Sequence, residues 1–563
     1  MKDQAAVRLA IKISLSNFRH ANLSLASHLS RLQMPIKIFV SDDVSDSGLE
    51  PLRSDSFQID KRTGLKGEEL SAALRETDGL IVRSETKVTA ELMSAAPNLR
   101  VVGRAGVGVD NIDVAAATAR GIVVMNAPDG NTITTAEHTI ALLVALARNV
   151  PQANSSVKAA KWERKKFIGA ELRGKTLGII GLGRIGRAVA QRAAALGMKI
   201  VAHDPFIAVD SAGDVEIESA SLDQVLARAD FLTIHTPLTT ETRGLINADA
   251  FEKMKPGARV INCARGGLID EAALHDAIVS GKIAGAALDV FEQEPPPAEH
   301  PLLRLDEVIV TPHLGASTTE AQEAVAFTVA EQMHDYFMTG ALRGAVNMPA
   351  VGAKELATLQ PYLSLAESLG RFQAQLVDSA VREVRLDFAG ELLDIDATPV
   401  TRAFLAGLLR DVSARVNIVN AFLIAEERGI TVTTSYVRGS SVPSAIRTTV
   451  GSGAGEQTAS GSVFTTAEDY REGRITRING FRIEAIPRGH MLVMHNRDVP
   501  GVIGKVGTIL GDAGINISAF HLGRRERGGE AMAVIEFDGS LTGETIAKIR
   551  AFFPIISARQ IEL

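Results

Sequence analysis

The chain has 563 residues, a formal net charge of −6 and 46% hydrophobic residues, which is enough for several domains that each have a core. The slightly acidic balance gives no positive field for nucleic acid, and no apolar run reaches the roughly 18 residues of a membrane span. The single cysteine, Cys263, excludes an intrachain disulfide framework and favours a reducing compartment such as the cytoplasm. We therefore expect a globular protein that has neither nucleic acid nor membrane as a partner.

The first 33 residues differ from the rest of the chain. They carry five basic residues, five serines and a single acidic residue, and the first predicted strand begins only after Met34. This composition is typical of a transit peptide, which would make the protein organellar, but a start codon upstream of the true Met34 explains it equally well. In either case we expect residues 1–33 to be an extension that is disordered or loosely attached.

From residue 36 onward, short apolar runs alternate with stretches of helical spacing. The first strands are predicted at 36–40, 79–82, 99–102 and 121–125. Strands that alternate with helices indicate a parallel sheet covered on both faces. A long helix at 134–149 leads to a second unit, and a helix from 319 to 338 is expected to return to the first one. Residues 35–133 and 319–345 are thus predicted to form one discontinuous domain, with 134–318 as the other.

The second unit opens with an apolar strand that stops at three glycines. Gly181 would allow a sharp turn, Gly183 would let a pyrophosphate approach the backbone, and Gly186 would let the next helix pack on the strand. Amides at the start of that helix would hold the phosphates. A second strand ends at Asp204, where a carboxylate can accept hydrogen bonds from a ribose and repel a 2′-phosphate. The pattern predicts NAD rather than NADP; a similar unit without a dinucleotide is the minor alternative.

Three side chains that suit dehydrogenation follow later strands of this unit. Arg265, Glu294 and His313 come after apolar runs at 259–262, 284–290 and 308–311. Each alone is ordinary: a turn arginine, a loop glutamate and a structural histidine. Ligands bind at the carboxyl ends of such strands, so the shared position favours a site. Histidine titrates near neutrality and can take a hydroxyl proton, while a guanidinium can hold a carboxylate by two hydrogen bonds.

An ordered set of motifs resembles the D-2-hydroxyacid dehydrogenase family. It comprises GLGRIG at 181–186, HTPL at 235–238, INCARGGLIDE at 261–271, ALDVFEQEP at 287–295 and TPHLGAST at 311–318. The resemblance implies that His313 exchanges the proton of the substrate oxygen, that Glu294 is its partner, and that Arg265 clamps the substrate. It implies an NAD site, without a metal, at Gly181, Gly183, Arg184, Ile185, Gly186, Asp204, Thr236, Cys263, Ala264, Asp289, Gly315 and Ala316. Cys263 is interpreted as packing rather than as a nucleophile.

Two further motifs resemble the branch of that family that oxidises 3-phospho-D-glycerate to 3-phosphohydroxypyruvate, the first step of L-serine biosynthesis. They are VGRAGVGVDNID at 102–113 and WERKKFIG at 162–169. The resemblance places the substrate phosphate near Arg83, Arg104 and Asn126. Arg164, Lys165 and Lys166 form a second basic group, and a solvated helix end explains them equally well. The family's dimer would bring this group near a neighbouring site, so we expect a homodimer or a homotetramer.

The last third resembles the long form of this branch. Residues 347–484 show helical patterns near 353–377 and 399–428 and a Gly/Ser/Thr-rich stretch at 451–461, without a catalytic signature. Residues 489–563 have a β-α-β-β-α-β pattern that resembles a regulatory ACT domain. Asp498 and Asn516 stand where that family binds an amino acid, which suggests L-serine as an effector. The plain alternative is that both residues only cap a helix and shape a turn.

The predicted fold class is α/β. It combines a doubly wound Rossmann-type sheet with a discontinuous flavodoxin-like substrate domain, an α+β intervening domain and a ferredoxin-like ACT domain. The near functional alternative is a glyoxylate or hydroxypyruvate reductase, which shares Arg265, Glu294 and His313 but needs no phosphate-binding arginines. A protein of a different class, which binds NAD(H) and responds to it without turnover, is the third interpretation.

Overall fold

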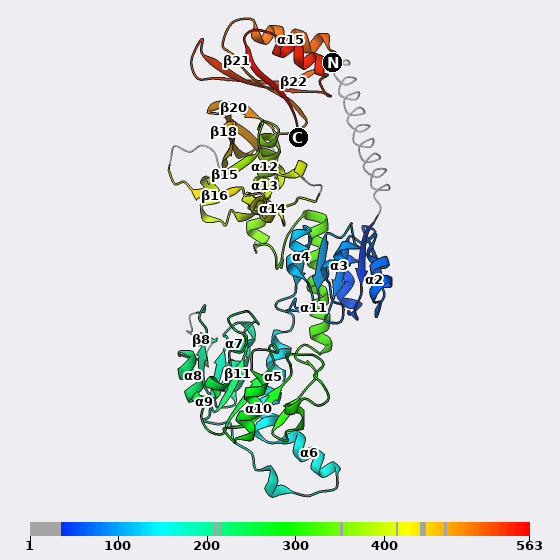
Figure 1. Cartoon of the computed structure of the whole chain (residues 1–563), viewed down its shortest axis with the longest axis vertical. Coiled ribbons are helices and arrows are strands. Elements are labelled where there is room, and N and C mark those ends of the chain that lie inside the picture. Colours follow the sequence, from blue (N-terminus) through cyan, green and yellow to red (C-terminus); the bar gives the residue numbers. More distant parts are fainter. Residues whose placement is uncertain are drawn as a thin grey trace, which may run out of the picture.

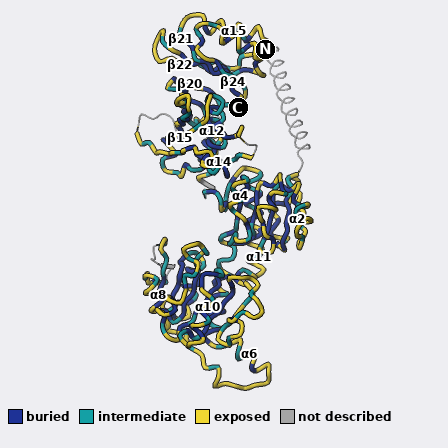
Figure 2. The backbone as a smooth tube through the Cα atoms, viewed as in Figure 1, coloured by how far each residue is buried: buried dark blue, intermediate teal, exposed yellow. Residues whose placement is uncertain are grey.

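The computed structural model describes residues 35–207, 211, 212, 215–349, 353–412, 415–439, 446–466 and 470–563. The extension predicted at 1–33 lies outside the described residues. Figure 1 shows four units along the long axis of the molecule, with the C-terminal unit at one end and the unit of α7 to α10 at the other. Figure 2 shows buried backbone in the interior of each unit and exposed backbone around α6. Within the described part of the chain, no helix is long and apolar enough to cross a membrane.

The N-terminal unit is a five-stranded parallel sheet of order β2-β1-β3-β4-β5. Val325, Val329 and Met333 of helix α11 lie in the core of this sheet, so the chain returns to it as predicted. The sequence analysis missed β2, because its alternating polar residues give a weak apolar signal. The elements are β1 (Ile36–Val40), η1 (Ser47–Leu52), β2 (Phe57–Lys61), α2 (Gly67–Leu74), β3 (Gly79–Val82), α3 (Ala90–Ser94), β4 (Val101–Arg104), α4 (Val114–Ala119), β5 (Val123–Asn126) and α11 (Thr319–Thr339).

The second unit is a seven-stranded parallel sheet of order β10-β7-β6-β11-β12-β13-β14. The order reverses at β6, as in a doubly wound fold, so the predicted α/β class is confirmed. Helix α5 links the units and buries Leu143 against Val189 of α7 in one core. The elements are α5 (Thr132–Ala147), α6 (Val150–Lys158), η2 (Arg164–Phe167), β6 (Thr176–Ile180), α7 (Arg184–Ala195), β7 (Lys199–His203), β8 (Ser211–Ala212), β9 (Val215–Glu216), β10 (Glu218–Ser219), α8 (Leu222–Arg228), β11 (Phe231–Ile234), α9 (Ala248–Lys253), β12 (Ala258–Asn262), α10 (Glu271–Val279), β13 (Ile283–Leu288), η3 (Pro301–Arg304) and β14 (Val308–Val310).

The third unit is a six-stranded sheet of order β16-β15-β17-β18-β19-β20. The Gly/Ser/Thr-rich stretch at 451–461 contributes to β17 and β18, because small residues let helix α12 approach: a Cβ on Gly461 would lie 3.0 Å from the Leu365 side chain. The helical pattern at 399–428 forms two helices. The elements are α12 (Ala353–Ala374), β15 (Val381–Phe388), η4 (Gly390–Asp394), α13 (Thr398–Leu408), η5 (Arg410–Val412), α14 (Ala421–Glu427), β16 (Thr431–Tyr436), β17 (Ile446–Ser452), β18 (Gly455–Thr465), β19 (Arg471–Ile478) and β20 (Phe481–Ala485).

The C-terminal unit has the predicted β-α-β-β-α-β order in an antiparallel sheet of order β22-β23-β21-β24. Met491 and Val534 of this sheet share a core with Phe481 of the third unit. Leu492 and Ile535, which alternate with them, instead pack with the helices. The sheet thus joins the third unit through one face and its own helices through the other. The elements are β21 (His490–Arg497), α15 (Val502–Asp512), β22 (Ile517–Arg524), β23 (Glu530–Phe537), α16 (Gly543–Arg550) and β24 (Ile555–Glu562).

Candidate active site

The glycine turn between β6 and α7 leaves no room for side chains at two of its three glycines. A Cβ on Gly181, whose φ is +90°, would lie 2.6 Å from the carbonyl oxygen of His235. A Cβ on Gly186 would lie 2.1 Å from the carbonyl oxygen of Gly181. Gly183 instead caps α7 and has no atom within 4 Å of its Cβ position. The turn therefore packs tightly against the sheet and leaves the first amides of α7 open to an anion.

Asp204 ties the end of β7 to this turn. Its Oδ2 accepts the Leu182 amide at 2.8 Å, and its Oδ1 accepts the amides of Phe206 at 2.9 Å and Ile207 at 3.0 Å. Burial raises the pKa of the Asp204 carboxyl, but the three amide donors outweigh it and the net pKa lies below its ordinary value. The carboxylate is thus ionised at neutral pH, as an acceptor for ribose hydroxyls must be.

Two polar atoms beside the glycine turn fit a bound dinucleotide. Thr236 Oγ1 and His235 Nδ1 are buried and have no hydrogen-bond partner among the described residues. The Thr236 methyl lies 2.8 Å from the Cβ position of Gly181, so the Thr236 side chain borders the turn. Burial lowers the pKa of His235 to about 4, so its ring is neutral at physiological pH. Unpaired buried polar atoms are costly, and the polar groups of NAD would satisfy them.

The other residues predicted to bind the cofactor take different positions. Arg184 is exposed and forms an ion pair with Asp129, in the loop before α5, while Ile185 is half-buried beside it. Burial raises the pKa of the Cys263 thiol to about 12, which agrees with packing rather than nucleophilic chemistry. The Ala264 amide donates to Asn262 Oδ1 at 3.0 Å and shapes the turn after β12.

His313 and Glu294 come together at the carboxyl ends of β14 and β13. His313 Nδ1 lies 2.7 Å from Glu294 Oε2, and the Phe291 amide donates to Glu294 Oε1 at 3.1 Å. Burial raises the pKa of Glu294, but its hydrogen bond with His313 and the charge of that ring outweigh burial and lower the net pKa. The carboxylate fixes the ring and leaves Nε2 of His313 for a ligand. A cavity of about 340 Å³ borders the pair.

Asp289 organises the loop that carries His313. This buried carboxylate accepts the amides of Leu314 at 2.7 Å and Gly315 at 2.8 Å. It also accepts the Thr311 hydroxyl and lies 3.2 Å from Nε2 of His138 on α5. The sequence analysis missed His138, because one histidine on a helix gives no local signal. Ala316 follows this anchored loop and is half-buried.

Arg265 reaches from the second unit to the N-terminal unit. Its Nε donates to Asp110 at 3.0 Å, and its Nη2 lies 1.9 Å from the Cβ position of Gly108. Arg104 lies close by: burial first, and then the positive charges of Arg265 and Arg83, lower its pKa to about 10. Nε of Arg104 is buried and has no hydrogen-bond partner in the described part of the chain. The Arg104 and Arg265 guanidiniums thus lie against the same loop, at Gly106 and Gly108, and Arg83 is near enough for its charge to act on Arg104.

The remaining residues predicted to bind substrate lie in three different surroundings. Asn126 donates its side-chain amide to the Val107 carbonyl and thereby supports the loop after Arg104. Arg83 donates its backbone amide to the buried Asp42 at 2.6 Å. The basic group Arg164, Lys165 and Lys166 lies on η2, where all three side chains are exposed.

Comparison with known proteins shows which families and relatives this chain is similar to. Family profiles match residues 140–315 as "D-isomer specific 2-hydroxyacid dehydrogenase, NAD binding domain", residues 358–479 as "D-3-phosphoglycerate dehydrogenase intervening domain" and residues 490–554 as "ACT domain". A D-3-phosphoglycerate dehydrogenase of Archaeoglobus fulgidus is 43% identical over 94% of this chain and all of its own length. One of Bacillus subtilis is 43% identical over 94% of this chain and 99% of its length. The chain belongs to the D-3-phosphoglycerate dehydrogenase family.

Solved structures match a little over half of the chain. The TT0316 protein of Thermus thermophilus has 35% identity and a TM-score of 0.51, over 55% of this chain and 100% of its own. A glyoxylate reductase of Paecilomyes thermophila has 30% identity and a TM-score of 0.51, over 56% of this chain and 99% of its own. NAD is therefore the cofactor of the second unit, which carries the NAD-binding domain of the family. The roles of individual residues stay predictions.

The ACT domain of this family member separates its two predicted effector residues. Asp498 Oδ2 accepts Arg524 at 3.0 Å and the Gly528 amide at 3.1 Å, beside the pairing of Arg497 with Glu530. Asn516 donates to Asp538 at 2.9 Å, beside the opposite end of β23. Within one chain, the two side chains therefore do not form a common site.

Proposed function

We propose that the chain oxidises 3-phospho-D-glycerate to 3-phosphohydroxypyruvate with NAD⁺, the first step of L-serine biosynthesis. The observation that carries the proposal is that Arg265 of the second unit and Arg104 of the N-terminal unit lie against the same loop, at Gly108 and Gly106, with the charge of Arg83 acting on Arg104. Burial first, and then the charges of Arg265 and Arg83, lower the pKa of Arg104, while the carboxylates of Asp110 and Asp42 oppose this shift. An anion placed beside these cations would be bound strongly. A substrate with a carboxylate and a phosphate supplies that charge, and charge-assisted hydrogen bonds are strongest to such groups.

The residues divide the chemistry between them. Bound NAD⁺ supplies the acceptor for the hydride that leaves C2 of the substrate. His313 takes the proton of the 2-hydroxyl on Nε2, because Glu294 already engages Nδ1 at 2.7 Å. The C2–H and O–H bonds break as the carbonyl forms: the hydride leaves with both electrons of the C2–H bond, and the hydroxyl proton goes to His313. Arg265 holds the carboxylate and the developing carbonyl, while Arg104 and Arg83 attract the phosphate.

The decisive experiment is a substrate panel followed by NADH absorbance. Phosphoglycerate, glycerate, glycolate and 2-hydroxyglutarate are compared for the wild type, Arg83→Gln and Arg104→Gln. Losing one charge-assisted hydrogen bond costs about 1.5–3 kcal/mol, so kcat/KM for phosphoglycerate should fall about 10- to 100-fold while that for glycerate changes little. Arg62→Gln is the control, because Arg62 pairs with Asp60 on the surface of the same unit. Equal losses on both substrates would move the phosphate site, with Arg164 and Lys165 as the next candidates.

A reductase of glyoxylate or hydroxypyruvate is the second candidate, because one structural neighbour is a glyoxylate reductase. Such an enzyme needs no phosphate site, so the same panel would favour unphosphorylated substrates. A protein that only binds NAD(H) would bind the cofactor and turn over nothing. The paired His313 and Glu294 argue against that third possibility, since a binding role does not require a proton acceptor.

The ACT domain is proposed to bind L-serine, the product of the pathway. Because Asp498 and Asn516 lie at opposite ends of one sheet, a ligand that contacts both must lie between the ACT domains of two chains. Calorimetry should detect serine binding to the wild type, turnover should fall, and Asp498→Ala with Asn516→Ala should lose both effects. Wild-type protein that fails to bind serine at millimolar concentration would leave the domain as an assembly element.

We further propose a homodimer or a homotetramer located in the cytoplasm. Exposed apolar side chains gather along α6 and the segment after it, including Val157 (54% exposed), Trp162 (78%) and Ile168 (81%). Such a patch is typical of an interface between subunits. Sedimentation should give a dimer or larger, and Trp162→Asp with Ile168→Asp should shift the population toward monomer. A wild type that sediments as a monomer would contradict this proposal.

A further inference from the structure

The segment that carries Glu294 has no regular secondary structure between β13 and η3. Glu294 must nevertheless hold His313 Nδ1 at 2.7 Å for the proton transfer. A loop on its own does not fix a side chain to that accuracy, so its position has to come from contacts with rigid elements.

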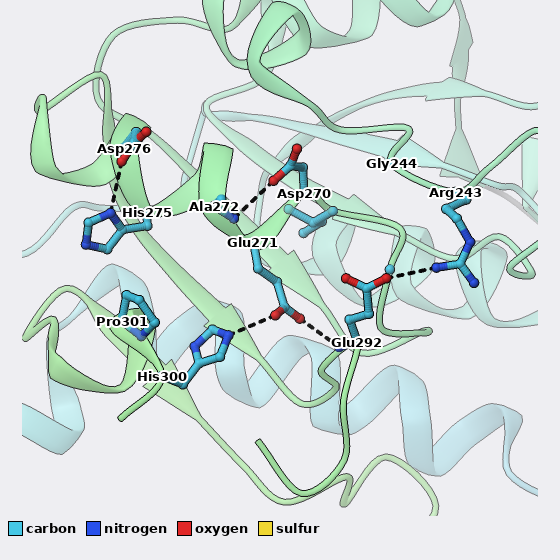
Figure 3. A pocket seen from close by; sticks show the side chains of 12 residues that line it. Arg243, Gly244, Asp270, Glu271, Ala272, His275, Asp276, Glu292, His300 and Pro301 are labelled. Atoms are coloured by element: carbon cyan, nitrogen blue, oxygen red, sulfur yellow. Dashed lines mark hydrogen bonds and ion pairs between the residues drawn. The ribbon is translucent and has the colours of Figure 1, made fainter. Parts of the chain in front are cut away.

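One carboxylate fastens this segment at both ends. Glu271, the first residue of α10, accepts the Glu292 amide on Oε1 at 2.7 Å and lies 2.9 Å from His300 Nε2 through its Oε2. Figure 3 shows Glu271 between the other two residues, beside a cavity of about 540 Å³. The Glu271 and His300 side chains are 19% and 16% exposed, so this pair is far better shielded than a surface salt bridge.

Packing extends the contact to both predicted catalytic loops. The His300 ring meets the Phe291 ring edge-on at 5.6 Å, and the Phe291 amide is the one that binds Glu294. A Cβ on Gly266, next to Arg265, would lie 1.8 Å from the Phe291 carbonyl oxygen. The turn at Phe291 therefore supports Glu294 directly and touches the Arg265 loop.

We propose that Glu271 and His300 are positioning residues that set Glu294 against His313. This inference rests on the proposed acid–base role of His313. Neither residue touches the reacting atoms, so each acts through the segment that carries Glu294. A misplacement of about 1 Å in a catalytic group can cost about 100-fold in rate, which makes a loosened segment visible in kcat.

The test uses the full-length enzyme and three variants. Glu271→Ala removes both contacts and should lower kcat about 10- to 100-fold, with the KM for NAD unchanged. His300→Phe keeps a ring against Phe291 but loses the donor, and should give a smaller loss. His300→Gln keeps a donor at similar reach and should restore most of the lost kcat. Thermal unfolding and NAD binding check that each variant is folded.

A matched control lies beside the same cavity. Arg243 pairs with Glu292 at 3.0 Å, but both side chains are more than half exposed, and such pairs contribute little. Arg243→Gln should leave kcat and its pH profile as in the wild type, since the Glu292 backbone amide stays bound to Glu271.

A double-mutant cycle distinguishes a role of Glu271 in positioning Glu294 from a general loss of structure. If Glu271 acts through Glu294, Glu271→Ala should change the pH profile of kcat/KM as Glu294→Gln does, and should add almost nothing in the Glu294→Gln background. Additive losses with an unchanged pH profile would overturn the inference, as would full kcat in Glu271→Ala. Absent turnover by the wild type, or full activity of His313→Ala, would instead refute the proposed function and is measured in the same assay.

Discussion

Gly183 and Gly186 lie three residues apart in one turn, yet alanine should affect them in opposite ways. A Cβ at Gly183 meets no protein atom within 4 Å, whereas a Cβ at Gly186 would lie 2.1 Å from a backbone oxygen. The φ of Gly183 is −66°, which alanine adopts without strain. Gly183→Ala should therefore fold normally and bind NAD poorly. Gly186→Ala should lose stability first.

The magnitudes follow from these two distances. Overpacking a core costs about 1–3 kcal/mol, and a Cβ against a backbone oxygen belongs near the top of that range. The helix propensity of alanine offsets about 1 kcal/mol, which leaves a loss of about 2 kcal/mol for Gly186→Ala. That corresponds to about 4–8 °C in the melting temperature of a unit of this size. At Gly183, the methyl group occupies the approach of the pyrophosphate. Losing one charge-assisted hydrogen bond weakens binding about 10- to 100-fold.

Calorimetric titration with NAD⁺ and thermal unfolding without it measure the two effects separately. Saturating NAD⁺ should raise the melting temperature of the wild type more than that of Gly183→Ala, because stabilisation by a ligand depends on its affinity. An unchanged Kd for NAD⁺ in Gly183→Ala would refute the placement of the pyrophosphate. An unchanged melting temperature in Gly186→Ala would mean that α7 moves away from the turn at no cost.

Three further predictions use the charges of the site. Asp204→Ala should narrow the ratio of kcat/KM for NAD to that for NADP, because the group that accepts ribose hydrogen bonds and repels a 2′-phosphate is gone; an unchanged ratio would place specificity in the loop after Asp204. Cys263, whose thiol pKa is raised to about 12, should resist a thiol reagent in native protein at pH 8 and react after unfolding; reaction at the same rate in both states would contradict its burial. The net pKa of Asp289 is lowered: burial raises it, but hydrogen bonds from His138, Thr311 and Leu314 outweigh burial. The ionised Asp289 therefore stabilises the folded state fully above the unfolded pKa of about 3.9, and this stabilisation is lost as the pH falls through the lower folded pKa. The difference in unfolding free energy between wild type and Asp289→Asn should be largest near pH 6 and shrink below pH 4, and a constant difference would show that the charge is unimportant.

The sequence predicted those features that depend on neighbours in the chain. The glycines at 181, 183 and 186 encode a turn, and Asp204 marks the end of the next strand. In the structure, Asp204 accepts the Leu182 amide and thereby joins the strand end to the turn. The alternation of strands and helices likewise predicted both parallel sheets. In each case the information lies within one βα unit, where periodicity and glycine chemistry decide the result.

Features that depend on distant contacts were not predictable in this way. His138 meets Asp289 across 151 positions of the chain, and Asp42 supports the Arg83 amide across 41. His313 adopts a φ of +55°, which is uncommon for a residue other than glycine even though histidine tolerates it better than most, so contacts of the folded chain hold it there. The third unit was described only as helical and strand-like patterns, because its small residues matter through the approach of α12 rather than through any local preference.

The contact between the N-terminal and the second unit involves charged side chains that can exchange partners. Arg265 of the second unit pairs with Asp110 of the N-terminal unit, but the Asp110 side chain is 67% exposed, so this pair contributes little stability. A substrate carboxylate offers the same guanidinium two planar hydrogen bonds in a more enclosed place. Under the proposed placement of the substrate, the exchange of Asp110 for it costs little, and Arg104 gains a counter-charge in addition to those of Asp110 and Asp42. Under the proposed placement of the substrate, its binding would draw the two units together, because each unit contributes cations to the same anion.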